Sequence, residues 1–215
     1  MNQVIIDKLE KFFADYTQKT YNAGQVIILA DQEPEGILYL EQGTVEQYDI
    51  NQDGVKVTVN IYRSPAFFPM SWAINDTPNE YFYEASSQVK LRVADPKKTL
   101  AFVKSNPEIM FDLMSRVYKG TDALLRRLAL AGTGVARERL MYELLIESYR
   151  FGAQTGDGQF VINVKQNALA ARSGLARETV SRELHKLEQL GFITMSKKGI
   201  VVDTTKFKHR PDSNA

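Results

Sequence analysis

The 215-residue chain contains no cysteine, only two histidines and one tryptophan. The absence of cysteine excludes disulfide bonds, thiolate-bound zinc and iron–sulfur clusters held by cysteine, and it suits a reducing compartment. No apolar run reaches the roughly 18 residues of a membrane span, so we expect no membrane partner. The N-terminal segment also lacks the basic region, apolar run and cleavage site of a secretory signal. We therefore expect a cytoplasmic protein.

A strong net charge is missing as well. The chain has 27 basic and 26 acidic residues, which gives a formal charge of +1. The two kinds of charge are not evenly spread, because residues 133–215 hold 13 lysines and arginines against 9 acidic residues. This mild asymmetry indicates the C-terminal third as the part that would meet nucleic acid, although alone it carries little weight.

Short segments rich in β-branched and aromatic residues dominate the first half of the chain, after an amphipathic helix expected over residues 2–16. Asp53-Gly54 lies between two such segments and is typical of a hairpin turn. Several short strands at this spacing predict a β-sandwich or jelly roll. The segments cover residues 23–30, 36–50 and 55–62.

Residues 107–131 carry the pattern of a long helix, and Pro107 suits its first turn. Val117, Leu124 and Leu128 repeat at coiled-coil spacing, which predicts a parallel homodimer through these residues. The alternative is that the same apolar stripe packs only against the chain's own β-domain.

A glycine-flanked break at Gly132-Thr133-Gly134 is predicted to end the long helix. Another helix is expected over residues 135–151, followed by a polar turn over residues 152–159. Because such breaks tolerate large changes in backbone angle, the break indicates a hinge between two domains.

Residues 164–184 are typical of a helix-turn-helix. Leu169 is the inward residue of a short first helix, and Gly174 can supply the positive φ that the tight turn needs. Residues 192–203 then predict two short strands joined at a basic turn, Lys197-Lys198-Gly199. A helix-turn-helix followed by such a wing is a DNA-binding arrangement, in which the second helix enters the major groove.

The second helix has two distinct sides. At about 100° per residue, Leu184 and Leu187 fall within about 40° of Val180 and form a stripe that can be buried. The polar residues lie opposite this stripe or on its flanks. An amphipathic helix usually has a merely solvated polar face, but here the side chains match bases, because arginine can pair with guanine and glutamate with cytosine. The polar residues are Arg177, Glu178, Ser181, Arg182, His185 and Gln189.

The segment RETVSRELHKLEQLGFI, residues 177–193, resembles the recognition helix of the CRP/FNR superfamily (the cyclic-AMP receptor protein and the fumarate-nitrate reductase regulator). The resemblance extends over nearly the whole chain. It implies an α+β fold with an N-terminal β jelly roll of the cyclic-nucleotide-binding type, a dimerisation helix and a C-terminal winged helix-turn-helix. The corresponding divisions are a sensing domain over 1–106, a dimerisation helix and hinge over 107–132, and a DNA-binding domain over 133–215.

The resemblance also implies roles on DNA and a bacterial regulator that acts with RNA polymerase. Glu178 and Arg182 would read a G·C pair and its neighbour within a TGA core of an inverted repeat. Arg177 matches one branch of the family and Ser181 the other, so the outer half-site base stays open. The residues expected at phosphates or flanks are Gln166, Thr179, His185, Lys197 and Lys198.

The family's phosphate cassette for cyclic nucleotides is replaced here. Pro69-Met70 stands where the family has Gly-Glu, and Asn79-Glu80 where it has Arg-Ser. Proline lacks the N–H that could face a phosphate, and a carboxylate would repel it, so we expect no cyclic AMP binding. Both histidines, His185 and His209, belong to the DNA-binding part, which serves a histidine-held haem poorly. A haem with other ligands stays open, and no cofactor is expected.

An aromatic cluster stands in place of the cassette. One interpretation is an apolar pocket for a small hydrophobic effector; the other is that the rings fill the space of the nucleotide. Because neighbours on a strand point to opposite faces, Tyr81 and Tyr83 cannot line the same pocket as Phe82. The candidate pocket residues are Phe67, Phe68, Met70, Trp72, Phe82 and Leu124.

No catalytic constellation is present: the sequence has no Ser-His-acid signature, glycine-rich phosphate loop or metal cluster. We therefore expect a transcriptional regulator and not an enzyme. Two kinds stay open: one controlled by an unknown effector that is not cyclic AMP, and one that binds DNA constitutively with a filled β-roll.

Overall fold

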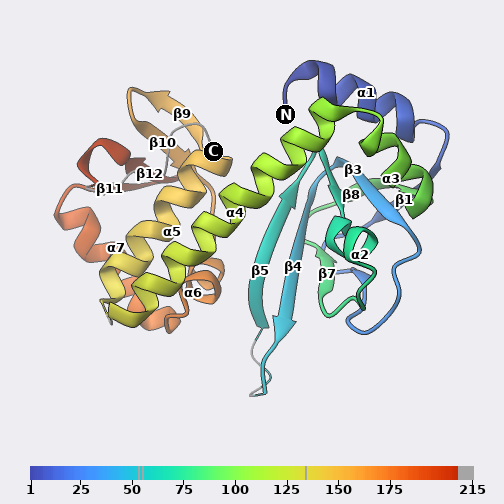
Figure 1. Cartoon of the computed structure of the whole chain (residues 1–215). Coiled ribbons are helices and arrows are strands. Elements are labelled where there is room, and N and C mark those ends of the chain that lie inside the picture. Colours follow the sequence, from blue (N-terminus) through green and yellow to red (C-terminus); the bar gives the residue numbers. More distant parts are fainter. Residues whose placement is uncertain (53, 55, 134, 208–215) are drawn as a thin grey trace. The chain divides into compact units, whose positions relative to one another are not determined.

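The computed structural model describes residues 1–52, 54, 56–133 and 135–207, with only the backbone of Thr133. Three residues of the sequence predictions, Asp53, Gly134 and His209, lie outside the described residues. The chain forms two compact units, residues 1–115 and residues 116–215. The long helix α4 (Pro107–Thr133) contributes to both units (Figure 1).

The first unit contains a β-roll of two four-stranded antiparallel sheets, as the sequence predicts. Their strand orders are β1-β8-β3-β6 and β2-β7-β4-β5. The hairpin expected around Gly54 is confirmed, because β4 and β5 pair antiparallel from Thr44 opposite Arg63 to Ile50 opposite Lys56. The strands are β1 (Thr17–Tyr21), β2 (Val26–Ile28), β3 (Ile37–Gln42), β4 (Thr44–Ile50), β5 (Lys56–Arg63), β6 (Ala66–Phe68), β7 (Phe82–Ala85) and β8 (Val89–Ala94).

Three further helices complete the first unit: α1 (Gln3–Phe13), α2 (Met70–Asn75) and α3 (Pro96–Lys104). Helix α1 is amphipathic and buries Ile5, Leu9 and Phe13. These side chains pack with the start of α4 through Ile109 and with the roll through Tyr39. The roll therefore has two apolar clusters, one between its sheets and one beneath its helices.

The second unit combines the end of α4 with helices α5 (Ala136–Phe151), α6 (Gln166–Ser173) and α7 (Arg177–Gln189). Its antiparallel sheet has the order β11-β12-β10-β9. Arg127 of α4 donates from Nε and Nη2 to the two carboxylate oxygens of Glu143 of α5, at 2.6 and 2.9 Å. The remaining elements are β9 (Ala153–Gly156), β10 (Gln159–Ile162), β11 (Ile193–Ser196), β12 (Gly199–Asp203) and the 3₁₀ turn η1 (Thr204–Lys206).

The long helix ends within the predicted break, at Thr133. It still includes Gly132, because one glycine in a helix costs only about 1 kcal/mol. One sequence prediction in this unit is wrong in detail. The segment expected as a polar turn contains strand β9, paired with β10. All four β9 residues are exposed, so they lack the alternating apolar pattern by which strands are found in sequences.

Candidate nucleic-acid interface and β-roll interior

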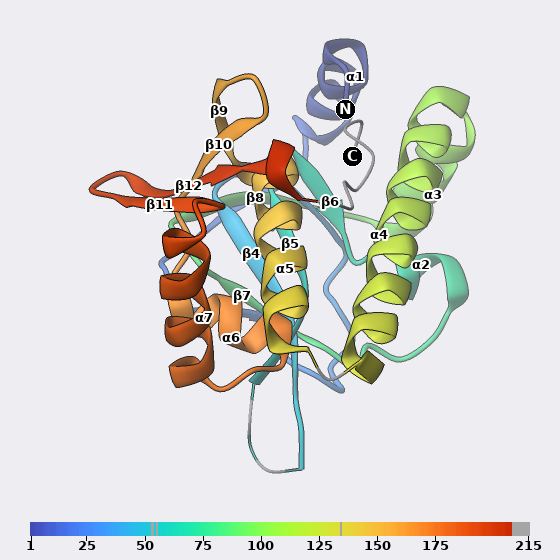
Figure 2. The same ribbon diagram turned by 90° about the vertical axis from the view of Figure 1, so that its left-hand side faces the viewer.

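Helix α7 runs beside α6 and α5 within the second unit (Figure 2). It packs its apolar stripe into the core of this unit and leaves its polar side exposed. Val180, Leu184 and Leu187 are 0%, 3% and 0% exposed, which confirms the stripe expected from the sequence. They share one core with Leu169 of α6 and Leu144 of α5. The buried stripe fixes which side of α7 faces solvent.

All four residues expected to read bases lie on that accessible side: Arg177, Glu178, Ser181 and Arg182 are exposed. Arg182 donates from Nη2 to Oγ1 of Thr179 at 3.3 Å, rather than to Glu178. A bond at an exposed site contributes little net free energy, because water can replace it. The Arg182 guanidinium is thus available to exchange this bond for two bonds to a guanine.

The residues expected at phosphates are accessible too. Gln166 begins α6 and is half-buried, and His185 is exposed and lies 3.1 Å from the Gln189 amide nitrogen. Lys197 and Lys198 are exposed between β11 and β12, where the sequence places a wing. All nine candidate DNA-binding residues thus belong to the second unit and are at least partly accessible.

The wing turn is held by its own polar contacts. Ser196 Oγ donates to the Gly199 carbonyl at 2.8 Å and accepts from the Lys198 N–H at 3.2 Å. Gly199 has a φ of +131°, and a Cβ there would lie 2.2 Å from the Ile162 carbonyl oxygen. The turn therefore requires glycine, and it presents two lysines to solvent.

The sequence did not reveal what holds the flank of α7. Glu183 is only 8% exposed and forms ion pairs with Arg137 of α5 at 3.2 Å and with Lys186 at 2.7 Å. The hydrogen bond from Lys186 lowers the pKa of the Glu183 carboxyl, against the opposing effect of burial, and Arg137 lowers it further. Glu183 is therefore a structural residue that ties α7 to α5.

The turn between α6 and α7 is held by Arg139 of α5. Its guanidinium donates to the Ser173 carbonyl from Nε at 2.9 Å and also from Nη2, and Nη2 donates to the Gly174 carbonyl at 2.8 Å. Gly174 has a φ of +61°, which confirms the predicted use of glycine. No sequence signal marked Arg139, since its partners are backbone carbonyls that any residue could provide.

Helix α6 is anchored to α5 by a buried ion pair. Arg172 Nη1 lies 2.6 Å from Glu147 Oε2, and the two side chains are 6% and 2% exposed. Arg172 Nε also donates to the Ala168 carbonyl at 3.2 Å. Burial without a partner would make either charge costly, so the pair holds the two helices in one register.

A stack of aromatic rings lies in the interior of the β-roll. Phe68 of β6 stacks on Tyr62 and on Tyr83, with centroids 4.6 and 5.3 Å apart. Phe68 and Tyr83 are each 1% exposed, and burial raises the pKa of the Tyr83 hydroxyl. The Tyr62 hydroxyl donates to the Gln47 side-chain oxygen at 3.1 Å, so this buried amide oxygen has a hydrogen-bond partner.

The five candidate effector residues of the first unit do not share one packing environment. Phe67 and Met70 pack with Trp72 in the cluster beneath the helices, whereas Phe68 belongs to the cluster between the sheets. Phe82 points to the other face of β7 and stacks on Tyr48 at 5.1 Å. Leu124 is 50% exposed on α4. The expected grouping is corrected for a physical reason: alternation along β6 sends Phe67 and Phe68 to opposite faces, as it does Phe82 and Tyr83.

The positions that replace the phosphate cassette are used for structure. The Asn79 side chain donates to the carbonyls of Leu29 and Tyr81 at 3.0 and 2.9 Å, and it is 6% exposed. Pro69 and Met70 are buried at the start of α2, while Glu80 is exposed. An amide occupied by two backbone carbonyls has no donor left for a phosphate.

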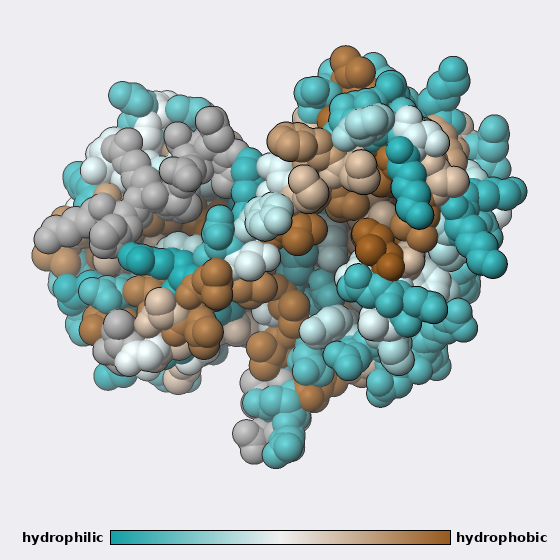
Figure 3. All heavy atoms as spheres, in the orientation of Figure 1, coloured by the Kyte–Doolittle hydropathy of each residue, from teal (hydrophilic) through white to brown (hydrophobic). Residues whose placement is uncertain are grey.

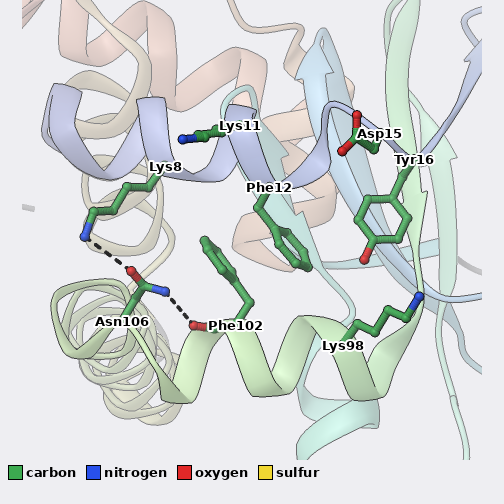
Figure 4. A pocket seen from close by; sticks show the side chains of 8 residues that line it. All are labelled: Lys8, Lys11, Phe12, Asp15, Tyr16, Lys98, Phe102 and Asn106. Atoms are coloured by element: carbon green, nitrogen blue, oxygen red, sulfur yellow. Dashed lines mark hydrogen bonds between the residues drawn. The ribbon is translucent and has the colours of Figure 1, made fainter.

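A surface pocket of about 630 Å³ lies between α1 and α3. Phe12 and Phe102 stack at its centre with centroids 4.1 Å apart, and Lys8 donates to Asn106 at 3.2 Å (Figure 4). Lysines, one carboxylate, one amide and aromatic rings line the pocket. None of the six candidate effector residues is among them. Its full lining is Lys8, Lys11, Phe12, Asp15, Tyr16, Lys98, Phe102 and Asn106.

Helix α4 exposes a broad apolar side. Val117, Leu124 and Leu128 of the predicted dimer seam are 59%, 50% and 71% exposed, and Figure 3 shows hydrophobic side chains gathered over this helix. Further large apolar side chains flank the seam and are also exposed. They are Met110, Phe111, Met114, Tyr118 and Leu125.

Within the described residues, no group of three or more histidine or acidic side chains is arranged to hold a metal ion. Across that same part of the chain, no helix combines the length and the apolar character needed to span a bilayer.

Comparison with known proteins identifies both units. Residues 18–106 match the cyclic nucleotide-binding domain, and residues 138–209 match the Crp-like helix-turn-helix domain. The chain is 27% identical over 191 residues to the global nitrogen regulator of Nostoc sp. PCC 7120, covering 86% of this chain and 84% of that protein. It is 26% identical over 152 residues to the transcriptional regulator SdrP of Thermus thermophilus, covering 71% of each chain.

Solved structures share the fold. A cyclic nucleotide-binding domain protein from Listeria monocytogenes superimposes with a TM-score of 0.78 at 17% identity, covering 95% of this chain and 100% of the other. The c-di-GMP responsive global regulator CLP of Xanthomonas campestris gives 0.71 at 18% identity, covering 92% and 98%. The β-roll, the long helix and the winged helix-turn-helix thus occur in the same order in this chain and its relatives, and the chain belongs to the CRP/FNR superfamily of DNA-binding transcriptional regulators, which are not enzymes.

Proposed function

We propose that the protein is a homodimeric transcriptional regulator that reads an inverted repeat with TGA-containing half-sites. The observation that carries this proposal is the exposed side of α7, on which Arg177, Glu178, Ser181 and Arg182 stand opposite a fully buried stripe. Arg182 donates to guanine, and Glu178 accepts from the cytosine amine. In this proposal the protein acts in the cytoplasm together with RNA polymerase.

The dimer part of the proposal is supported by the exposed apolar side of α4. Large apolar patches on a protein surface mark interaction sites, and the seven-residue spacing of Val117 and Leu124 suits a parallel pair of helices. Two-fold symmetry would relate the two copies of α7, and helix-turn-helix dimers bind half-sites about one helical turn of DNA apart, which is the geometry of an inverted repeat.

Selection from a random duplex library tests the DNA part. The wild type should enrich TGA-containing palindromes, and Arg182→Ala should relax the preference at one base pair. Selection of sites without a TGA palindrome, or an unchanged preference in the Arg182→Ala protein, would show that α7 does not read DNA in this way.

Cyclic AMP is not the effector in this proposal, because Asn79 and Met70 are committed to the fold where the family binds the nucleotide. Relatives differ in their ligands: CLP is described as c-di-GMP responsive, and CprK has been solved in complex with OCPA. This chain would respond to an unknown effector that is not cyclic AMP.

The stacked rings of Phe68, Tyr62 and Tyr83 favour a second candidate, a regulator that binds DNA constitutively with a filled roll. Abundance would then be its only control. Measuring DNA affinity before and after denaturation, ligand removal and refolding separates the two. A lower affinity that is restored by the removed extract supports an effector, and equal affinity supports constitutive binding.

A further inference from the structure

Arg139 is joined to the turn of the helix-turn-helix by several hydrogen bonds and not by packing alone. Three N–H groups of one guanidinium donate to two consecutive carbonyls, those of Ser173 and Gly174. These carbonyls end α6, immediately before α7 begins at Arg177. A rigid planar fork fixes both the position and the orientation of the peptide units that it binds.

The same turn of α5 holds α7 at a second point. Arg137, two residues before Arg139, pairs with Glu183 in the middle of α7. The first turn of α5 therefore contacts both the segment before α7 and the middle of α7. Arg177 and Glu178 lie directly after the turn that Arg139 holds, so a shift of this turn would move these two residues with it.

We propose that Arg139 is a positioning residue for base recognition: by clamping the α6–α7 turn it sets the depth and angle at which α7 presents its side chains to the major groove. The space for the clamp exists only because residue 174 is glycine. A Cβ at Gly174 would lie 2.6 Å from Arg139 Nη2, so any larger residue displaces the guanidinium. This inference rests on the proposed reading of DNA by α7.

The test compares Arg139→Gln with the wild type on the duplex that the wild type selects and on a duplex of scrambled sequence. Removing charge-assisted hydrogen bonds should weaken binding to the selected site by roughly 10- to 100-fold. Binding to the scrambled duplex should stay within about twofold, because phosphate contacts position the protein without reading sequence. Arg139→Lys keeps the charge but not the fork, so it should restore little of the specificity.

This readout separates positioning from two other roles. Partial unfolding lowers the active fraction equally for both duplexes and leaves their ratio unchanged. A direct contact between Arg139 and a phosphate would weaken both duplexes and reduce the salt slope by about one. An unchanged ratio or a reduced slope on the scrambled duplex would overturn the inference. The selection experiment on the wild type tests the proposed function independently, and its outcome does not depend on Arg139.

A pair of glycine variants provides the matched control. Gly174→Ala and Gly191→Ala both introduce a side chain at positive φ, +61° and +74°. At Gly191 the new Cβ meets only the flexible end of Lys206, at 3.4 Å. Gly174→Ala should therefore lose specificity as Arg139→Gln does, and Gly191→Ala should not. The double variant of Gly174 and Arg139 should be no worse than either single variant, whereas additive losses would contradict a shared clamp.

Discussion

The buried pair between Arg172 of α6 and Glu147 of α5 allows one sharp test of what holds the DNA-binding unit together. We consider Arg172→Met, which keeps the length of the apolar stem and removes the charge. The Glu147 side chain is 2% exposed, so water cannot replace the lost partner. The variant therefore removes this ion pair from a buried carboxylate.

Removing one partner of a buried pair costs about 3–5 kcal/mol. A domain of this size is stable by about 5–15 kcal/mol, so Arg172→Met should remove about a fifth or more of the free energy of unfolding of the second unit. Adding Glu147→Gln should recover about 1 kcal/mol, because a neutral amide is less costly to bury than a carboxylate that has lost its ion pair with Arg172. The half-exposed Lys186, which pairs with Glu183, gives the control: Lys186→Met should cost less than about 1 kcal/mol.

The single tryptophan makes the assay selective. Trp72 belongs to the first unit, so its fluorescence during urea unfolding reports only that unit and should not change between variants. Amide hydrogen exchange in α5 and α6 reports the second unit. Equal protection of α6 in the wild type and in Arg172→Met, or a double variant less stable than the single one, would refute the reasoning.

Four further outcomes follow from the structure. Leu124→Glu places a charge in the exposed seam of α4 and should give monomers with weak DNA binding in sedimentation; a wild type that is itself monomeric at micromolar concentration would contradict this. Titration calorimetry with cyclic AMP should show no binding, and a micromolar dissociation constant would overturn the interpretation of the replaced cassette. Lys197→Ala should weaken binding to all duplexes alike and lower the salt slope by about one, and a loss confined to the selected site would count against a phosphate contact. The pKa of the Glu183 carboxyl is lowered in the folded protein, so its ion pairs stabilise the fold at pH values above the ordinary pKa of 4.5. This contribution to stability is lost as the pH falls through the folded pKa. Glu183→Gln should therefore flatten the fall in the free energy of unfolding on acidification, and an unchanged acid profile would show that these pairs do not contribute.

The parts of the fold that were predictable are those in which side-chain pattern decides the structure. The burial of Val180, Leu184 and Leu187 follows from helical periodicity alone. The positive φ of Gly174 follows from the tight turn that it occupies. Strand β9 could not be found, because its residues are all exposed and its place is set by pairing with β10.

Exposure of the candidate site was predictable, whereas the contacts that Arg139 and Asn79 make inside the fold were not. Arg182 and Glu178 lie on the exposed side of α7, which meets DNA in the proposed function, and their kind and spacing carry information in the sequence. Arg139 and Asn79 act on backbone carbonyls of distant residues, and such partners have no signature in a sequence. The aromatic pocket failed for a related reason, since Phe67 and Phe68 belong to a short strand whose two faces serve different cores.

The exposed apolar side of α4 has a consequence for the response of this regulator to its own concentration. In the homodimer proposed above, each protomer brings half of every DNA-reading surface. Below the dissociation constant of the dimer, the concentration of complete readers rises as the square of the protomer concentration. A doubling of synthesis then raises operator occupancy almost fourfold while sites are mostly empty. In the second candidate function, constitutive binding, this dependence would give a steep response without any small molecule, because the abundance of the chain would be the signal.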